Sequence, residues 1–250
     1  MGTMQDMVNN NEKCRIEKEG DGFHVLLNPE SVTKALNDKL LPEDIQQGMN
    51  IVNNVLNLSS INNSLHRQCI DINCVNKCTS PFKSIPNGNP NARIMLLNKM
   101  PTDYESCRMC SHCDTASIFL SLVLSRINIS RNDVYCTDMI KCNCNTLDEQ
   151  SFRSCIESYL LKEVQYVHPE IIICDGVAVL KSWAKLGYID GLPQDIQYGN
   201  IYDVVISGIS LKIMAIFDID RVIQKQGEDL IECKGKLWLQ IIKAINAIGG

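Results

Sequence analysis

Cysteine is the residue with the clearest chemical potential in this sequence, which has 13 cysteines among 250 residues. Thiolates are ligands for zinc and for iron-sulfur clusters, and cysteines in a reducing compartment bind metals more often than they form disulfides. An odd number of cysteines also cannot pair completely within one chain. The cysteine content therefore favours a metal or cluster site.

Ten of the cysteines fall into three groups in predicted loops or at the ends of predicted elements. The groups are Cys69, Cys74 and Cys78; Cys107, Cys110 and Cys113; and Cys136, Cys142, Cys144 and Cys155. Loops and element ends allow the backbone to wrap around a metal. The CxxCxxC spacing of the middle group could supply three ligands of a second metal or redox site, with Cys136 or Cys144 as the fourth. Cys174 ends an apolar run, so we expect a core residue there.

The elements that must position these groups follow an α/β pattern. Four short β-prone runs alternate with helical patterns, which is typical of buried parallel strands. The runs are residues 93–97, 133–137, 170–174 and 212–217, and the helical patterns cover 116–124, 152–167 and 236–248. The sequence predicts a three-layer α/β sandwich with a central four-stranded parallel sheet.

The chain divides at a loop region rich in Cys, Asn, Pro and Gly, which covers residues 69–91. We expect residues 1–68 to form an Asn-rich, partly helical extension, with an amphipathic helix over 42–56. Residues 69–250 are expected to form the α/β domain.

Charge and hydropathy limit the kinds of function. The chain has 24 basic and 29 acidic residues, a net charge of -5, which argues against a broadly cationic nucleic-acid coat. No apolar run reaches the roughly 18 residues of a membrane span, and the N-terminus lacks the pattern of a signal peptide. We expect an intracellular protein that is neither secreted nor inserted in a membrane.

Three segments, in this order, resemble successive blocks of the iron-sulfur uracil-DNA glycosylases, often called family 4. They are residues 89–97 (NPNARIMLL), 131–142 (RNDVYCTDMIKC) and 168–176 (HPEIIICDG). The resemblance covers about residues 69–248. It implies the uracil-DNA glycosylase-like α/β fold.

The resemblance also implies a [4Fe-4S] cluster. In that family a Cys pair before the first strand, the Cys of a Lys-Cys motif after the second strand and a Cys on the following helix hold the cluster. The matching residues here are Cys74, Cys78, Cys142 and Cys155. The first pair is spaced C-x3-C instead of the family's C-x2-C, with Cys69 as a competing ligand. Zinc is the alternative occupant, because four thiolates suit either.

The base pocket of the resembled family is changed at every position that contacts uracil. Its Gly-rich loop after the first strand reads Asn-Lys-Met-Pro-Thr here, over residues 98–102, and retains only the Pro. The family's stacking Phe falls on His112, its Asn on Asp138, and its His-Pro motif on Asp218 and Ile219. The candidate pocket residues are therefore Lys99, Met100, His112, Asp138 and Asp218.

These changes alter the expected chemistry. An ionised Asp138 can only accept hydrogen bonds, so it would favour a base with an exocyclic amine, such as cytosine or adenine. Asp218 would place a carboxylate where negative charge builds up on the leaving base, unless Lys99 compensates or Asp218 is protonated. Asp218 or Asp138 could instead act as a general base on a water molecule.

We therefore expect a divergent iron-sulfur DNA glycosylase-like protein that binds nucleic acid and excises a base other than uracil. DNA contacts would be local, through cations such as Lys99, Arg108, Lys141 and Arg221. One alternative is a catalytically inactive glycosylase-fold module that binds DNA or a protein partner. A second is a redox or metal sensor that works through Cys107, Cys110 and Cys113.

Overall fold

The chain forms two compact units, Met1–Asn53 and Asn54–Gly250. The structure, a computed structural model, describes residues 83–102, 105, 111, 115–130, 133–143 and 148–249, and the backbone of 14–19 and 22–27. In the first unit, β1 (Cys14–Glu19) and β2 (Gly22–Leu27) form an antiparallel hairpin. The predicted helix over 42–56 and the predicted boundary at residue 69 lie outside the described residues.

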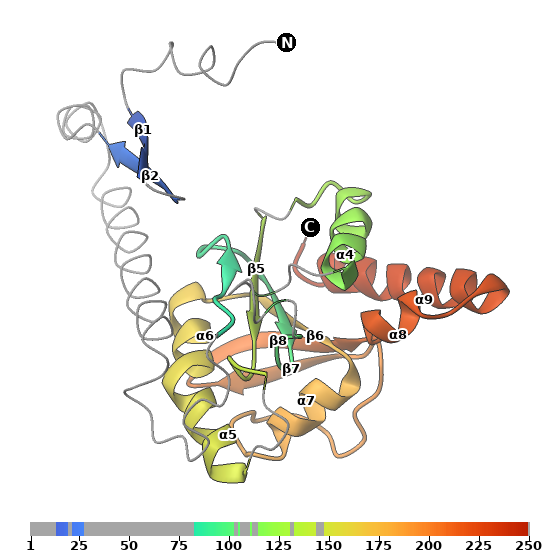
Figure 1. The fold of residues 1–250 in the computed structure, drawn as a ribbon. Helices are drawn as coiled ribbons and strands as arrows, with labels where there is room; N and C mark the ends of the chain where they lie inside the picture. The colour runs from blue at the N-terminus through green and yellow to red at the C-terminus, as the bar shows by residue number, and fades with distance from the viewer. Residues whose placement is uncertain are drawn as a thin grey trace. The chain divides into compact units, whose positions relative to one another are not determined.

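The second unit is built on a six-stranded sheet with the order β3-β5-β4-β6-β8-β7 (Figure 1). Its strands are β3 (Asn87–Gly88), β4 (Ile94–Asn98), β5 (Val134–Asp138), β6 (Ile171–Asp175), β7 (Ile201–Ile206) and β8 (Ile209–Ile216). Strands β5, β4, β6 and β8 are parallel, whereas β3 and β7 pair antiparallel at the two edges. The predicted four-stranded parallel sheet is confirmed, and the two edge strands extend it.

The parallel strands are apolar on both sides because each side of the sheet is covered. On β4, Met95 and Leu97 pack into one hydrophobic cluster, and Ile94 and Leu96 pack into the other. Successive side chains of a strand point to opposite faces, so a continuous apolar run fills two cores at once.

Helices form the two outer layers of the sandwich (Figure 1). The first layer contains α5 (Glu149–Cys155), the π-helical segment η3 (Ile156–Leu160), α6 (Leu161–Val167) and α7 (Val177–Ala184). The second contains α4 (Thr115–Ser125), α8 (Ile219–Ile223) and α9 (Gly227–Asn246). The predicted three-layer arrangement is confirmed.

The edge strand β7 is held by a tight hairpin to β8. Ser207 and Gly208 connect the strands, with φ angles of 51° and 80°. Positive φ at two successive residues fits the two-residue hairpin turn whose twist matches the flanking strands. The glycine meets this demand without steric cost, and the turn fixes the register from Ile201 to Ile206 against β8.

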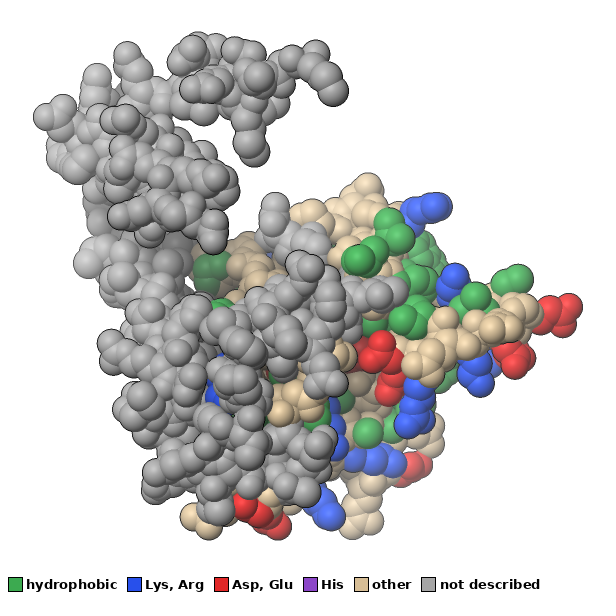
Figure 2. Space-filling model, in the orientation of Figure 1, with side chains coloured by type: hydrophobic (Ala, Val, Ile, Leu, Met, Phe, Trp, Pro, Cys, Tyr) green, Lys and Arg blue, Asp and Glu red, His purple; other side chains and the backbone are tan. Residues whose placement is uncertain are grey.

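Apolar side chains also reach the surface over the second helical layer. Ile118 and Leu122, one turn apart on α4, are 62% and 61% exposed, and Ile231 on α9 is exposed as well. Figure 2 shows hydrophobic side chains gathered over α4 and the adjoining part of α9. In the part of the chain that is described, no helix is both long and apolar enough to cross a bilayer.

Candidate functional site

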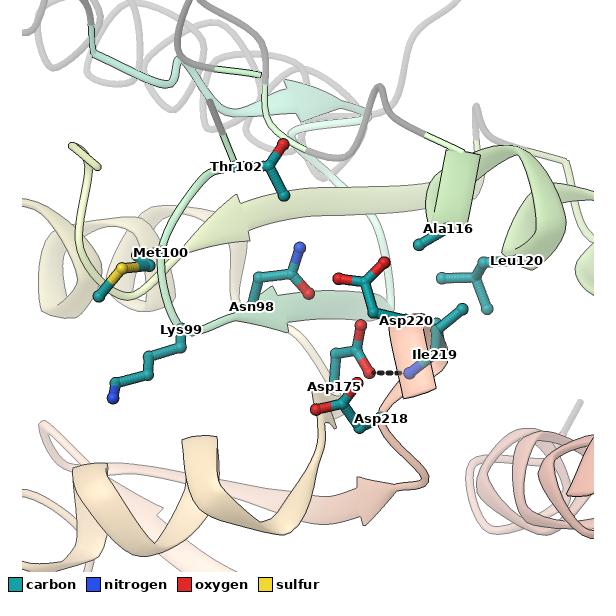
Figure 3. A pocket seen from close by; sticks show the side chains of 10 residues that line it. All are labelled: Asn98, Lys99, Met100, Thr102, Ala116, Leu120, Asp175, Asp218, Ile219 and Asp220. Atoms are coloured by element: carbon teal, nitrogen blue, oxygen red, sulfur yellow. Dashed lines mark hydrogen bonds between the residues drawn. The ribbon is translucent and has the colours of Figure 1, made fainter. Parts of the chain in front are cut away.

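A cavity of about 130 Å³ opens at the carboxyl ends of the parallel strands. Open α/β sheets place their ligands at this end, where loops diverge from the strands. The cavity is lined by Asn98, Lys99, Met100, Thr102, Ala116, Leu120, Asp175, Asp218, Ile219 and Asp220 (Figure 3). Its wall therefore comes from β4 and its following loop, from α4, from the end of β6, and from the start of α8.

Hydrogen bonds to backbone amides orient two of the carboxylates. Asp175 is the last residue of β6, and its Oδ1 accepts from the Ile219 amide at 2.8 Å. Asp218 is the N-cap of α8, and its Oδ1 accepts from the Arg221 amide at 3.0 Å. An N-cap carboxylate satisfies a free amide of the first helical turn and interacts favourably with the helix dipole. The start of α8 thus fixes the positions of both side chains.

Gly176 supplies the backbone conformation in which the chain leaves β6, although a Cβ there would meet only ordinary contacts. It follows Asp175 with a φ of 92°, a region that side-chain-bearing residues rarely adopt. A Cβ at this position would lie 3.5 Å from the Cβ of Asp218. The glycine therefore lets the chain leave β6 in a left-handed conformation directly beside the capping carboxylate.

The polar lining of the cavity consists mainly of hydrogen-bond acceptors. Figure 3 shows the side chains of Asn98, Asp175, Asp218 and Asp220 gathered around the same space. The Oδ1 atom of Asn98 is buried and accepts no hydrogen bond from the part of the chain that the structure describes. The ammonium group of Lys99 extends away from the carboxylates in this view. The cavity is therefore acidic, with a buried amide oxygen in its wall.

The loop after β4 is anchored from both sides. The backbone oxygens of Asn98 and Lys99 accept from the amides of Met139 and Ile140, at 2.8 and 2.9 Å. Further along, the buried carboxylate of Glu105 accepts from the Thr102 amide at 3.0 Å and from its hydroxyl at 3.2 Å. These bonds hold residues 98–102 as one wall of the cavity.

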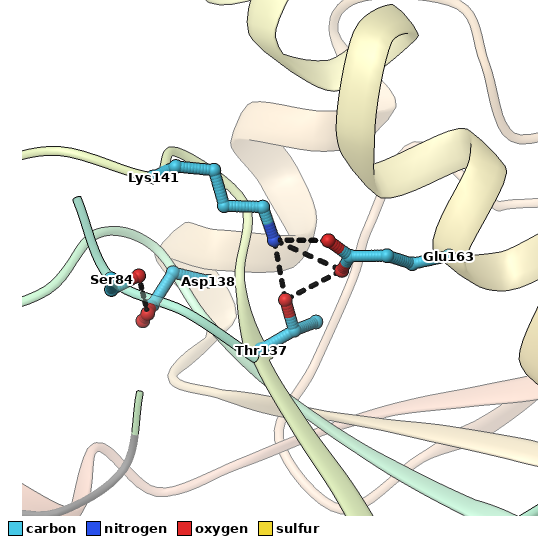
Figure 4. Close-up of polar contacts among 5 residues, drawn as sticks. All are labelled: Ser84, Thr137, Asp138, Lys141 and Glu163. Carbon is cyan, nitrogen blue, oxygen red and sulfur yellow. Dashed lines mark hydrogen bonds and ion pairs between the residues drawn. The ribbon is translucent and has the colours of Figure 1, made fainter. Parts of the chain in front are cut away.

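Asp138 lies next to this wall, but its side chain is buried and does not reach the cavity. It is fully buried, and its Oδ2 accepts from the Ser84 hydroxyl at 2.6 Å (Figure 4). Burial raises the pKa of the Asp138 carboxyl, and hydrogen bonds from Ser84 and Ser111 and the charge of Lys141 oppose this more weakly. Because its side chain is fully buried and bonded to Ser84, Asp138 is not placed to contact a base in the cavity.

A buried ion pair supports the end of β5. The ammonium of Lys141 lies 2.7 Å from Glu163 Oε1 and 2.9 Å from Oε2, and both side chains are inaccessible to solvent. The Thr137 hydroxyl donates to Glu163 Oε2 at 2.6 Å and accepts from Lys141 (Figure 4). This network joins the loop after β5 to α6, so Lys141 is a structural residue here and is not exposed for phosphate contacts.

Two of the four predicted cluster ligands, Cys142 and Cys155, are among the described residues. Cys142 follows β5 and Cys155 ends α5, and both pack against the hydrophobic cluster of the first helical layer. The π-helical segment begins directly after Cys155, and π-turns within helices are frequent at functional sites. Cys74 and Cys78 lie outside the described residues. Among the residues that are described, no three His, Cys, Asp or Glu side chains are placed to hold one metal ion.

The structure brings together three of the predicted pocket residues, Lys99, Met100 and Asp218. His112, Cys107, Cys110 and Cys113 lie outside the described residues, so the predicted stacking residue and second cysteine site stay predictions. The cavity is also lined by Asn98, Asp175 and Asp220, which were not among the predicted pocket residues. Each of these residues ends or closely follows a β-prone run, and that position was the signal that could have identified them.

Comparison with known proteins gives the family. The family model of the uracil DNA glycosylase superfamily matches residues 85–223, which is more than half of the chain. The matched range contains the parallel sheet, the cavity and α8. The chain therefore belongs to the uracil DNA glycosylase superfamily.

A similar protein is the type-4 uracil-DNA glycosylase of Archaeoglobus fulgidus. It is 25% identical over 133 residues, which make up 52% of this chain and 66% of that enzyme. The match thus spans a little less than two thirds of the relative's length. The relationship to type-4 enzymes expected from the sequence is confirmed.

Proposed function

We propose that this protein is a DNA glycosylase of altered specificity, which takes a flipped base other than uracil into the cavity and hydrolyses its N-glycosidic bond. The observation that carries the proposal is the acidic cavity at the carboxyl ends of β4 and β6, in a chain of the uracil DNA glycosylase superfamily. Glycosylases must extrude the target base from the stack, so a ring-sized pocket is the feature they require.

The charge of the cavity argues against uracil as the substrate. Uracil departs as an anion when its glycosidic bond breaks, and enzymes speed such steps with donors placed where the negative charge develops. Here Asp175, Asp218 and Asp220 line the same cavity, and Lys99 points away from them. Three carboxylates would destabilise a departing anion, so a base that leaves as a neutral molecule fits this site better.

Asp218 is the residue best placed to move a proton. In hydrolysis, the hydroxyl of water joins C1′ of the sugar while the C1′–N bond breaks and its electron pair leaves with the base. Asp218 accepts the proton of that water and passes it to the base nitrogen, so the base departs neutral. Its Oδ1 holds the start of α8 through the Arg221 amide, and its side chain remains 36% accessible to solvent.

A thiolate-bound [4Fe-4S] cluster completes the proposal, with Cys74, Cys78, Cys142 and Cys155 as its ligands and zinc as the alternative occupant. The resemblance to iron-sulfur glycosylases supports this assignment, with Cys142 after β5 and Cys155 at the end of α5. The cluster would have a structural role and join the segment before the sheet to the loop after β5 and to α5.

We also propose a cytoplasmic or nuclear location, because the chain has many cysteines and belongs to a family that acts on DNA.

The proposal is tested with end-labelled oligonucleotides, single-stranded and duplex, each with one uracil, cytosine, adenine or guanine at a fixed position. Alkali cleaves the strand wherever a base has been released. We expect cleavage at a base other than uracil, and loss of that cleavage in Asp218→Asn. The matched control is Asp203→Asn, which removes an exposed carboxylate on β7. An absence of abasic sites with every oligonucleotide would refute the proposal.

The second candidate is an inactive glycosylase-fold module that binds DNA or a protein partner. The observation that favours it is the same acidic cavity, because carboxylates oppose the family's usual leaving group. The exposed apolar side chains of α4 and α9 offer a surface to a partner. Oligonucleotide binding without release of any base would favour this candidate.

A further inference from the structure

We infer that the cavity recognises an aminopyrimidine, a cytosine-type base with an exocyclic amino group, and that Asn98, Asp175 and Asp220 read it. This inference rests on the proposed function, since it names the substrate class of the same cavity. The inference places base recognition at Asn98, at the end of β4. The resembled family uses the residue at the end of β5, which is Asp138 here.

The cavity has the volume of a single ring. A cavity of about 150 Å³ inside a protein is enough to hold benzene. The cavity here measures about 130 Å³ and is lined by Ala116, Leu120 and Ile219 on its apolar side. A pyrimidine fits this space more closely than the two fused rings of a purine.

Asn98 is the residue of the cavity that can read the edge of such a ring. Its register partner across the parallel strands is Asp138, which is fully buried and bonded to Ser84. Asn98 instead lines the cavity, and none of the described residues donates a hydrogen bond to its buried Oδ1. A buried acceptor without a partner costs roughly 1–3 kcal/mol in mutational data, so a ligand that supplies a donor is favoured.

The amide alone would not discriminate cytosine from uracil. An amide both donates and accepts, so it can match either pyrimidine edge. The discrimination comes from Asp175 and Asp220, because ionised carboxylates only accept hydrogen bonds. The amino group of cytosine can donate to these oxygens, whereas the corresponding carbonyl oxygen of uracil would be repelled.

A metal ion is a less suitable occupant of this cavity. Chelation of a hard cation needs several oxygens converging within a coordination shell. Within the described part of the chain, no set of three Asp, Glu, His or Cys side chains converges in this way. The described carboxylates thus do not supply the convergent oxygens that a hard cation requires.

The test compares deoxycytidine with deoxyuridine, two nucleosides that differ at the amino or carbonyl group of the ring. Binding to the full-length protein is measured by saturation-transfer NMR and by titration, without any chemical step. We expect deoxycytidine to bind at least about tenfold more tightly, the change expected from one good hydrogen-bonded pair. Asn98→Ala should weaken binding of deoxycytidine, and the double variant Asp175→Asn with Asp220→Asn should remove the preference.

The control variant is Glu228→Gln, which removes one exposed carboxylate of α9 outside the cavity and should keep the preference. Equal affinity for the two nucleosides, no binding of either, or a preference that survives the double variant would overturn the inference. Base release separates this result from the proposed function. A cytidine preference without release would overturn only the glycosylase proposal, whereas release without the preference would overturn only this inference.

Discussion

Asn98 and Asp138 are register partners at the carboxyl ends of β4 and β5, yet only Asn98 lines the cavity. Asp138 is covered by Ser84 and has no accessible surface. The resembled glycosylases use an amide at the position of Asp138. In this chain the amide lies one strand away, beside three carboxylates.

The burial of Asp138 predicts a pH-dependent stability. Burial raises its pKa above the ordinary value of 3.8, so the folded protein binds this proton more tightly than the unfolded chain. The stabilisation is complete below that ordinary value and is lost as the pH rises through the raised pKa of the folded state. Asp138→Asn cannot titrate and should lack this loss.

The measurement is urea unfolding of the parent protein and Asp138→Asn from pH 4 upward. The free energy of unfolding of the variant relative to the parent should increase with pH, by at most about 1.4 kcal/mol per unit, and then level off. A difference that stays constant with pH would show that Asp138 titrates normally.

The ion pair between Lys141 and Glu163 predicts a marked asymmetry between single and double substitutions. Glu163→Leu leaves the Lys141 ammonium buried without its counter-charge and should cost about 3–5 kcal/mol of unfolding free energy. Lys141→Met combined with Glu163→Leu should recover most of that loss, because no charge then remains buried. Thermal and urea unfolding of the two variants checks this. A double variant as unstable as the single one would contradict the explanation.

Asp218 has two separable roles, in capping and in chemistry. Asparagine is as good an N-cap as aspartate, so Asp218→Asn should keep the stability of the protein while it loses base release. Asp218→Ala should lose both, with a cost of about 0.5–2 kcal/mol from the missing cap. Calorimetry and the abasic-site assay on both variants separate the roles. Equal base release by Asp218→Asn and the parent would exclude Asp218 as the proton carrier.

The cluster assignment predicts which cysteines the metal needs. After anaerobic purification, Cys142→Ser should lose the iron and sulfide of one [4Fe-4S] cluster and its visible absorption. Cys110→Ser should retain them, because Cys110 is not one of the four proposed ligands. Cys174→Ser is a second control, because Cys174 is buried on β6 and burial raises its thiol pKa far above the ordinary range. Zinc in place of iron, lost with Cys142, would indicate the alternative occupant.

The parallel sheet could be predicted because its strands carry a strong signal. The run from Ile171 to Cys174, for example, is apolar at every position. A short run of this kind between two helices is typical of a parallel strand that is buried on both faces. The edge strand β7 was missed because Asp203 interrupts it and its burial alternates. The Ser207-Gly208 pair before the next apolar run was a usable hairpin signal.

The cavity was only partly predictable for a different reason. The family pattern selected Lys99, Met100 and Asp218, and these three residues line one cavity. The same pattern selected Asp138, whereas Asn98 and Asp175 were not selected. The burial of Asp138 depends on Ser84, which is distant in sequence and lies before the sheet. No local pattern encodes a contact of that kind.

The central claim is that the cavity accepts and releases a base other than uracil. The most direct measurement is mass spectrometry of the free bases that the protein releases from a pooled set of oligonucleotides containing uracil, cytosine, adenine and guanine. We predict that cytosine is released ahead of uracil, and that Asp218→Asn releases neither. Release of uracil alone, or of no base by protein that binds the oligonucleotides, would contradict the claim.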